Sequence, residues 1–486
     1  MPPRRSKAQR RRERLIRRIL VFGVMALLAV SIVIGVIAIG GKLFSSPSVP
    51  NDTTDPKPEQ PQEPKVVATA TVGNSGDILI HKPVLVSARE SAGVYNFDSM
   101  FQYMTPYVKA TDYAAINLEF GIGTGESDYY QREMLFRVPD SLIDTVMNTG
   151  YTLGLCANNH VSNGSSLTVT QNAYLDRNLD HIGLRASSND KRYLVKDING
   201  IKIGFVNYTY GAVTSNTSRV NYFSTTDLNA FYSDMGDLMT RMKSEGAEAI
   251  VLYIHWGNEY ETKPNQSQKA MAEKLCEMGV DVIVGGHPHK IQPLELVKAE
   301  NGNQTVCLYS MGNILSNQTI EAMYGGSSRT SSGNDWQLGG QCQYRDVKSR
   351  YNDPNYGNHH YDCNDNGHTE DGLLFEFSFN KYEDGTVLLS GVDVLPTWCY
   401  TTKRTDSGYN NYSIIPLDVA VSDWKSAFGI EDRDLIFAER SYDRTMALVG
   451  DGITTINGAC GLKIADYVEA YKAAQQPTDA TDTTAQ

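Results

Sequence analysis

Residues 249–289 read AIVLYIHWGNEYETKPNQSQKAMAEKLCEMGVDVIVGGHPH and predict a strand, a helix and a second strand. The first strand is expected over Ala249–Ile254, which is entirely apolar. The helix is expected over Gln266–Met278, because its apolar residues recur at the spacing of one helical face. The second strand is expected over Val280–Val284. This alternation predicts an α/β fold in which helices cover a sheet.

The same alternation continues on both sides of this unit. Further strands are expected at Val66–Thr71, Ala114–Asn117 and Thr305–Tyr309, and helices at Ser141–Asn148 and Leu228–Ser244. His181 is expected as a structural residue in the helical stretch LDRNLDHIG. The segment 320–370 is rich in Gly, Ser, Asn and Tyr and predicts a long surface insertion before a strand at 372–379.

The N-terminus carries a basic segment followed by a long apolar run. Residues 1–18 hold eight Arg, one Lys and one acid, and residues 19–41 hold no charge. As a helix, at ~1.5 Å per residue, the run spans about 35 Å, enough for a hydrocarbon core of about 30 Å. The positive-inside rule then predicts a single-pass cell-membrane protein with a cytoplasmic N-terminus and an extracellular C-terminal domain. A cleaved signal peptide is the alternative, although its apolar region is shorter, roughly 7–15 residues.

Composition divides the remaining chain. Residues 42–65 form a Pro-rich linker, residues 66–420 are expected to form one large domain, residues 421–474 a C-terminal extension, and residues 475–486 a disordered tail. The whole chain carries −12 and residues 1–42 hold ten basic groups and one acid, so residues 43–486 carry −21. Such an acidic region argues against nucleic acid as a partner, and it repels polyanions unless cations intervene.

Seven cysteines are present, with no CxxC pair. Three of them lie in apolar runs and are expected in the core: Cys156, Cys276 and Cys307. Three others are candidates for an extracellular disulfide whose pairing the sequence leaves open: Cys342, Cys363 and Cys399.

Side chains of the kinds that bind metals recur after the predicted strands, in the motifs SGDILIH, AAINLEFG, LGLCANNH, VLYIHWGNEY and DVIVGGHPH. The residues concerned are Asp77, His81, Asn117, Glu119, Asn158, Asn159, His160, His255, His287 and His289. Because α/β sheets place ligand sites at the carboxyl ends of their strands, one shared pocket is predicted. The alternative is five unrelated structural uses, with Asp77 as a turn residue after a glycine.

These ligand types suit two divalent metal ions, Mn, Fe or Zn. The glycine pair and Pro288 allow the loop to bend, so that His287 and His289 can face neighbouring ions. Glu119 is expected to bridge two cations about 3.5–4 Å apart, an arrangement that neutralises a phosphoryl group during in-line displacement.

The succession GDILIH, NLEFG, ANNH, HWGNEY, GGHPH and YSMGN resembles the CapA capsule-synthesis domain, a relative of calcineurin-like metallophosphoesterases. The resemblance runs from about residue 66 to 420 and includes PTW at 396–398 and IIPL at 414–417. It implies the calcineurin-like α/β sandwich, with sheets flanked by helices. It also implies an association with synthesis or export of poly-γ-glutamate at the bacterial surface.

The resemblance further implies a role for each site residue. Asp77 and His289 would hold one metal ion, and Glu119 would bridge to the other. The second ion would be held by Asn159, His255 and His287. His160 would act as general acid or electrostatic stabiliser. The pocket wall and its neighbouring turn would be built from Trp256, Glu259, Ser310, Gly312 and Asn313.

The chain departs from the family pattern at several positions. Leu79 stands where metallophosphoesterases have a His, which leaves His81 as the nearest imidazole. Glu119 replaces the Asp of the broader superfamily, and Asn163 replaces an Asp usual in the family. The insertion lies outside the family outline, and three of its histidines are expected on the surface: His359, His360 and His368.

Three functions are compatible with these features. The first is a metal-dependent phosphoesterase-like hydrolase or transferase acting on a cell-surface phosphoester. The second is a non-catalytic assembly factor that binds an anionic cell-surface polymer, together with capsule synthase subunits. The third, which ranks below the other two, is a receptor-like module with a degenerate site, and it is compatible with the leucine at position 79.

Overall fold

The computed structural model describes residues 61–130, 135–210, 217–318, 368–403 and 410–475. These residues lie in one compact unit. The predicted basic segment 1–18, the predicted transmembrane helix 19–41 and most of the predicted linker lie outside them. Among the described helices, none is both long and apolar enough to cross a bilayer.

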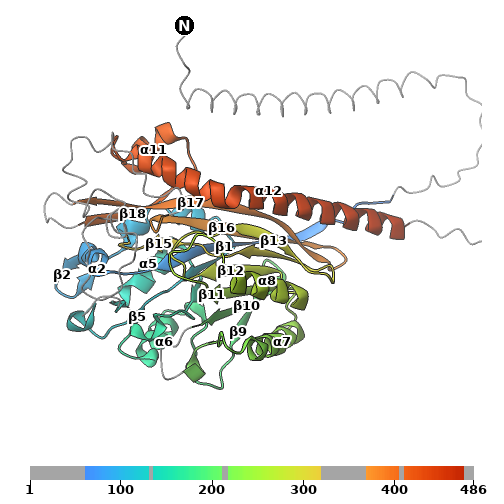
Figure 1. Ribbon diagram of the computed structural model, residues 1–486, viewed down its shortest axis with the longest axis horizontal. Coiled ribbons are helices and arrows are strands. Elements are labelled where there is room, and N and C mark those ends of the chain that lie inside the picture. Colours follow the sequence, from blue (N-terminus) through green and yellow to red (C-terminus); the bar gives the residue numbers. More distant parts are fainter. Residues whose placement is uncertain (1–60, 131–134, 211–216, 319–367, 404–409, 476–486) are drawn as a thin grey trace, which may run out of the picture. The chain divides into compact units, whose positions relative to one another are not determined.

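Two sheets form the centre of this unit (Figure 1). The first has the strand order β18-β17-β16-β1-β4-β7-β8, with β15 beside β1. Its strands are β1 (Val66–Ile78), β4 (Tyr113–Asn117), β7 (Leu153–Leu155), β8 (Asp180–Ile182), β15 (Asn313–Leu315), β16 (Asp371–Tyr382), β17 (Val387–Lys403) and β18 (Asn410–Pro416). Strands β1, β4, β7 and β8 run parallel, whereas β16, β17 and β18 add antiparallel neighbours.

The second sheet has the order β13-β14-β12-β11-β10-β9. Its strands are β9 (Tyr193–Ile198), β10 (Ile201–Thr209), β11 (Ala249–His255), β12 (Val282–Gly286), β13 (Leu294–Lys298) and β14 (Gln304–Leu308). The four central strands β10, β11, β12 and β14 are parallel. Two short ladders complete the described strands: β2 (Arg89–Ser91) with β3 (Val94–Tyr95), and β5 (Gly121–Ile122) with β6 (Arg137–Val138).

Strand side chains alternate between two cores. On β11, Val251 and Tyr253 enter the core between the sheets, whereas Ile250 and Leu252 face an outer core. That outer core is covered by α7 (Leu228–Ser244) and α8 (Gln266–Met278). The outer face of the first sheet is covered by α2 (Lys82–Ala88), α3 (Asp98–Phe101), α4 (Thr105–Val108), α5 (Ser141–Thr149) and α6 (Leu167–Leu175). The predicted mixed α/β fold with helix-covered sheets is therefore confirmed.

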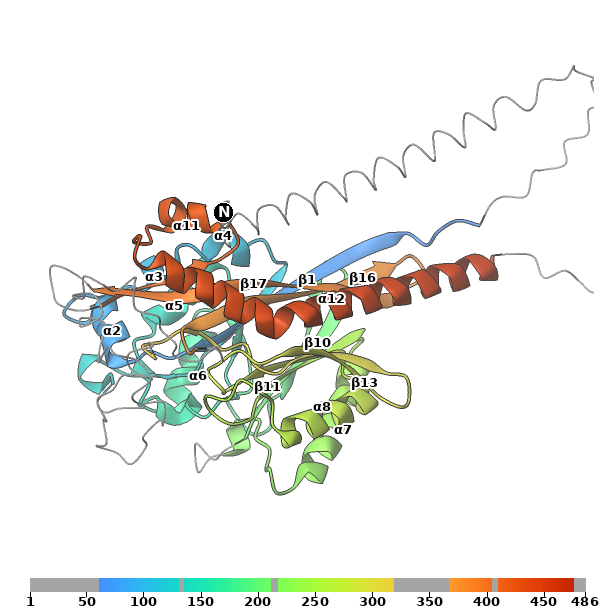
Figure 2. The same ribbon diagram turned by 45° about the horizontal axis from the view of Figure 1, so that its top comes forward.

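The C-terminal helices pack on the same unit. Figures 1 and 2 show α12 (Leu435–Ala474) lying along β17, with α11 (Val421–Phe428) at its beginning. Val449 and Ile456 of α12 belong to the core between the sheets. A Cβ on Gly452 would lie 2.0 Å from the Leu294 carbonyl oxygen, so only glycine allows α12 to approach β13 this closely.

Several local predictions match the structure. The helices predicted at Leu228–Ser244 and Gln266–Met278 have those bounds. The strand predicted at Val66–Thr71 continues to Ile78, which places Asp77 in a strand rather than in a turn. The strand predicted at Val280–Val284 begins two residues later and includes both glycines.

Other predictions were wrong. His181 lies on strand β8 rather than in a helix, because α6 ends at Leu175 and Asn178 adopts the left-handed conformation (φ 54°) that ends helical geometry. His368 is buried rather than on the surface. Cys399 is a buried free thiol that donates to the Ser316 carbonyl, and it forms no disulfide with any residue that the structure describes. Most of the predicted insertion lies outside the described residues, including His359, His360, Cys342 and Cys363.

Candidate metal centre

The candidate metal centre lies where strands of both sheets end. In the first sheet, Asp77 pairs in register with Asn117 on one side and with Asn313 on the other. In the second sheet, His255 pairs with Gly286. The loop after Gly286 carries His287 and His289 across to the first sheet, where the His289 Nδ1 lies 3.0 Å from the Asp77 Oδ2.

Two groups of three potential ligands share one carboxylate. Glu119, His255 and His287 form one group, and Asp77, Glu119 and His289 form the other. Within each group, one potential ligand atom per residue lies within 4.8 Å of the others. Asn159 joins the first group, because its Oδ1 lies 2.9 Å from the His255 Nε2. All six residues predicted as metal ligands are therefore brought together.

Unpaired polar atoms in this cluster fit the coordination of cations. The Oε1 of Glu119 and the Nε2 of His289 are buried and have no hydrogen-bond partner. Both side chains are fully buried, where an unmatched carboxylate oxygen or imidazole nitrogen costs about 1–3 kcal/mol. Carboxylate, imidazole and amide oxygen donors suit Zn, Mn or Fe. The donor set thus fits divalent metal ions, and both ligand groups would share Glu119.

The backbone around the centre is strained. His287, His289 and Tyr260 have φ angles of 95°, 56° and 66°, which non-glycine residues rarely adopt. Such strain clusters at functional sites, where surrounding contacts hold it in place. One such contact is the hydrogen bond from the Tyr260 amide to the Pro288 carbonyl, 2.8 Å long.

The two central carboxylates have opposite pKa shifts. Burial raises the pKa of Asp77, but hydrogen bonds and charge from His289, with a further hydrogen bond from Asn117, outweigh it and leave the pKa below its ordinary value. Burial and the neighbouring charge of Asp77 hold the pKa of Glu119 well above its ordinary value. Glu119 is thus the group with the least compensated charge, as expected for a carboxylate that faces cations.

The histidines divide in the same way. Burial lowers the pKa of His255 to about 4 and holds the pKa of His287 well below its usual range. For His289 burial acts in the same direction, but the Glu119 and Asp77 carboxylates outweigh it and raise the pKa to about 9. In the metal-free protein His289 is therefore the cation of the cluster.

His160 lies beside this cluster and is oriented by Asn163. The Asn163 Oδ1 accepts a hydrogen bond from the Phe136 amide (2.9 Å) and lies 2.9 Å from the His160 Nδ1. A backbone amide can only donate, so the oxygen of Asn163 faces both groups and His160 carries its proton on Nδ1. The His160 Nε2 is buried without a partner. Burial lowers the pKa of His160 to about 4.

The residues predicted to surround the ligands have different fates. Asn158 donates to the Asn117 Oδ1, and Asn117 donates to Asp77, so both orient a ligand. Asn313 does the same, with its Oδ1 3.1 Å from the His289 Nδ1. Glu259 faces the cluster, with its Oε1 4.0 Å from the His289 Nε2.

The other three predicted pocket residues make contacts away from the ligands. The Trp256 indole packs in the outer core and donates to the Tyr309 carbonyl. The Ser310 hydroxyl accepts from the Gly312 amide. His81 packs against Phe136 and its Nδ1 lies 3.1 Å from the Leu79 carbonyl, so it does not take the place of the missing histidine at position 79.

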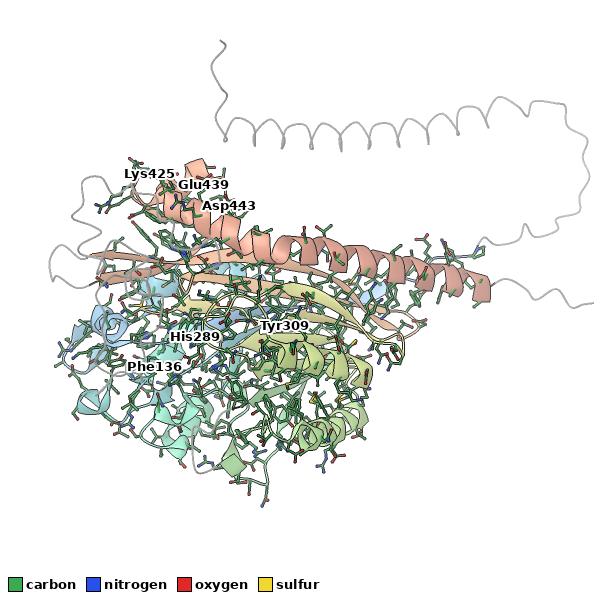
Figure 3. The ribbon with its side chains drawn as sticks, viewed as in Figure 1. Phe136, His289, Tyr309, Lys425, Glu439 and Asp443 are labelled. Atoms are coloured by element: carbon green, nitrogen blue, oxygen red, sulfur yellow. The ribbon has the colours of Figure 1, made fainter. Side chains whose placement is uncertain are left out.

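Aromatic residues around the centre were missed by the sequence analysis. Tyr210 packs edge-on against His287, Tyr260 lies beside His289, and Phe136 lies between His81 and His160. Tyr210 directly follows strand β10, and this strand-end position is the one feature that could have revealed it. Figure 3 shows His289 and Phe136 inside the domain, well away from Lys425, Glu439 and Asp443 on the C-terminal helices.

Comparison with known proteins points to one family. The model of the family described as "Bacterial capsule synthesis protein PGA_cap" matches residues 71–318, just over half of the chain. "Capsule biosynthesis protein CapA" of Bacillus anthracis is 27% identical over 256 residues, covering 50% of this chain and 59% of that protein. "PGA biosynthesis protein CapA" of Bacillus subtilis (strain 168) is 29% identical over 252 residues, covering 50% of this chain and 62% of that protein. The matched regions thus span about 60% of the length of these relatives. The matched range holds every candidate ligand, and the chain belongs to the PGA_cap family of bacterial capsule synthesis proteins, within the metallophosphoesterase-like superfamily.

Proposed function

We propose that this protein is a membrane-tethered, outward-facing CapA-like protein whose two-metal centre acts in the synthesis or export of a poly-γ-glutamate-type capsule polymer. The single observation that carries the proposal is the pair of ligand groups that share Glu119. The names of the two relatives, which refer to capsule and PGA biosynthesis, support the capsule assignment.

The residues of the centre divide the work between binding and proton handling. Asp77 and His289 would hold one divalent ion, Asn159, His255 and His287 the other, and Glu119 both. When bound, the ions would supply positive charge that stabilises a phosphoryl group. The unpaired His160 Nε2 would accept a hydrogen bond from the reacting molecule. Asn163 keeps that nitrogen free, because its Oδ1 accepts a hydrogen bond from the Nδ1–H on the opposite side of the ring.

The predicted topology places the centre away from the attachment point. β1 begins at Val66, directly after the predicted linker, and Asp77 lies near its other end. At ~3.3 Å per residue, a strand of this length separates Val66 and Asp77 by about 36 Å. The centre would therefore lie well away from the anchored end of the chain.

Metal content tests the proposal directly. Full-length protein should contain about two Mn, Fe or Zn ions per chain after reconstitution, as measured by elemental analysis. His255→Ala should lose one ion. The matched control is His181→Ala, which removes an imidazole on β8 that is hydrogen-bonded to the Gln171 side chain, and this variant should keep both ions. A wild-type protein that remains free of metal would sink the proposal.

A second function is favoured by Asn163. Its neutral amide cannot stabilise the doubly protonated, cationic form of His160 as a carboxylate would, and burial lowers the pKa of His160 to about 4. A neutral imidazole is a weak acid catalyst at pH 7, which favours a non-hydrolytic assembly factor that binds polymer carboxylates through the ions.

His160→Gln and Glu119→Gln distinguish the two functions in cells. If the protein is an enzyme, both substitutions should abolish surface polymer. If it is an assembly factor, only Glu119→Gln should do so. Surface polymer that survives Glu119→Gln and also deletion of the gene would exclude a capsule role altogether.

A further inference from the structure

The hydroxyl group of Tyr210 lies between a candidate ligand and a backbone carbonyl. Tyr210 follows the last residue of β10, and its ring meets the His287 ring edge-on, with centroids 5.3 Å apart and planes at 87°. Its oxygen lies 3.0 Å from the His287 Nε2. The same hydroxyl donates to the carbonyl of Gly257, in the loop after β11. Tyr210 thus connects three neighbouring strand ends.

The chemistry of these groups fixes the position of each proton. A phenol has one proton, and the Gly257 carbonyl can only accept, so the phenol donates to Gly257. The Tyr210 oxygen must then accept from His287, which requires the proton of the neutral His287 ring to be on Nε2. Its Nδ1 is left bare. That nitrogen faces the cluster, 3.1 Å from the His255 Nε2.

We propose that Tyr210 is a positioning residue that holds His287 as its Nε2–H tautomer and directs the Nδ1 lone pair at the second ion position. The inference rests on the proposed two-metal centre. Histidine ligands commonly donate their other N–H to an outer partner, which fixes tautomer and ring orientation. In this protein the outer partner is a tyrosine hydroxyl, and the Gly257 carbonyl fixes its direction in turn.

The orientation of the His287 ring depends on Tyr210, whereas the His289 ring is oriented by other residues. The His287 backbone is held at φ 95°, and its amide reaches the Asp77 Oδ2 only at 3.4 Å. The His289 Nδ1 has two close acceptors, the Asp77 Oδ2 at 3.0 Å and the Asn313 Oδ1 at 3.1 Å.

Tyr260 provides a matched comparison for Tyr210. Its ring lies beside His289, and its hydroxyl accepts from the Gln318 side chain. Removing the Tyr260 hydroxyl should therefore leave the His289 Nδ1 contacts with Asp77 and Asn313 unchanged.

Metal binding by Tyr210→Phe tests the proposal. Competition with a chelating dye, using Mn²⁺ or Co²⁺ and full-length protein, should show one ion bound about 10–100-fold more weakly and the other unchanged. Tyr260→Phe should leave both affinities as in the wild type. In a His287→Ala background, Tyr210→Phe should cause no further loss, because the residue that it positions is absent.

The tautomer itself provides a readout that does not need metal. In metal-free protein labelled with ¹⁵N-histidine, the His287 signal, assigned with His287→Ala, should show the proton on Nε2. A proton on Nδ1 in the wild type would overturn the proposal, even if Tyr210→Phe failed to fold. Two unchanged affinities in Tyr210→Phe would overturn only the role of Tyr210. A wild-type protein without metal would overturn the proposed function and the assignment of Nδ1 as a ligand together.

Discussion

Replacing Glu119 by Gln should stabilise the metal-free protein while abolishing its response to metal. The Glu119 side chain is fully buried and its Oε1 has no hydrogen-bond partner. Burial and the charge of Asp77 raise its pKa well above the ordinary value. The stabilising contribution of the protonated acid is complete only below the unfolded pKa of about 4.3, and it is lost as the pH rises through the folded pKa. At pH 7.5 the metal-free protein therefore gains from an uncharged amide.

The expected magnitudes have opposite signs with and without metal. Because burial opposes the ionisation of Glu119, replacing its carboxyl group by an uncharged amide should raise the free energy of unfolding of the metal-free protein by about 1–3 kcal/mol. An ion at 100 times its Kd stabilises the wild type by about 2.7 kcal/mol per site. Because Glu119 belongs to both ligand groups, Glu119→Gln should lose this gain at both sites. The order of stability should thus reverse when metal is added.

Urea unfolding followed by tryptophan fluorescence, with chelator or with Mn²⁺, measures both effects. Glu245→Gln is the matched control, because Glu245 is partly exposed and pairs with Lys191, so the change should stay within about 1 kcal/mol and be independent of metal. A metal-free Glu119→Gln protein that is less stable than the wild type would refute the charge argument. An undiminished metal response in this variant would refute the bridging role.

Three further predictions concern proton release, a buried ion pair and helix packing. His289 has a pKa of about 9 in the metal-free protein, so metal binding at pH 7.5 should release about one proton from it. In calorimetry the measured enthalpy of metal binding should therefore depend on the ionisation enthalpy of the buffer, and a binding enthalpy that is the same in all buffers would contradict this. Arg444 binds the buried Asp371 through two hydrogen bonds of 2.7 Å, so Arg444→Met should cost about 3–5 kcal/mol in urea unfolding. Burial raises the pKa of Asp371, but Arg444 outweighs burial and leaves the pKa below its ordinary value. The ion pair therefore stabilises the folded protein fully above the unfolded pKa of about 3.9, and this contribution is lost as the pH falls through the lowered folded pKa. A free energy of unfolding of the wild type that does not fall in this range would contradict the prediction. Gly452→Ala should lower the free energy of unfolding by about 1–3 kcal/mol, because the added methyl group overpacks against β13. The added Cβ of Gly458→Ala, on the same helix, meets no atom within 4 Å, so this substitution should raise the free energy of unfolding by up to about 1 kcal/mol. Equal effects of the two substitutions would exclude the packing argument.

Most of the core elements could be predicted from the sequence because their patterns are local. The strands ending at Asn117 and His255 are apolar runs of suitable length, and α8 shows regular helical spacing. The misassignment of His181 has a local cause as well. Nothing in LDRNLDHIG shows that Asn178 turns left-handed and separates a helix from a strand.

The conformation of the site depends on contacts that the local sequence does not contain. Tyr210 and His287 are 77 positions apart, and the direction of the phenol proton depends on a third residue, Gly257. Asp371 and Arg444 form their pair only because α12 packs on the sheets. No spacing rule connects such residues, since their proximity results from the packing of separate elements.

The sequence by itself determined which side chains stand at the strand ends, and hence the chemical types of the candidate ligands. A residue's type and its place after an apolar run are both written locally in the chain. Only the tertiary structure decided that Asp77 and His289, 212 positions apart, lie in contact, that Glu119 belongs to two ligand groups, and which histidine nitrogens remain bare. These properties arise from burial and from distances between elements of two sheets, which exist only once the sheets have packed together.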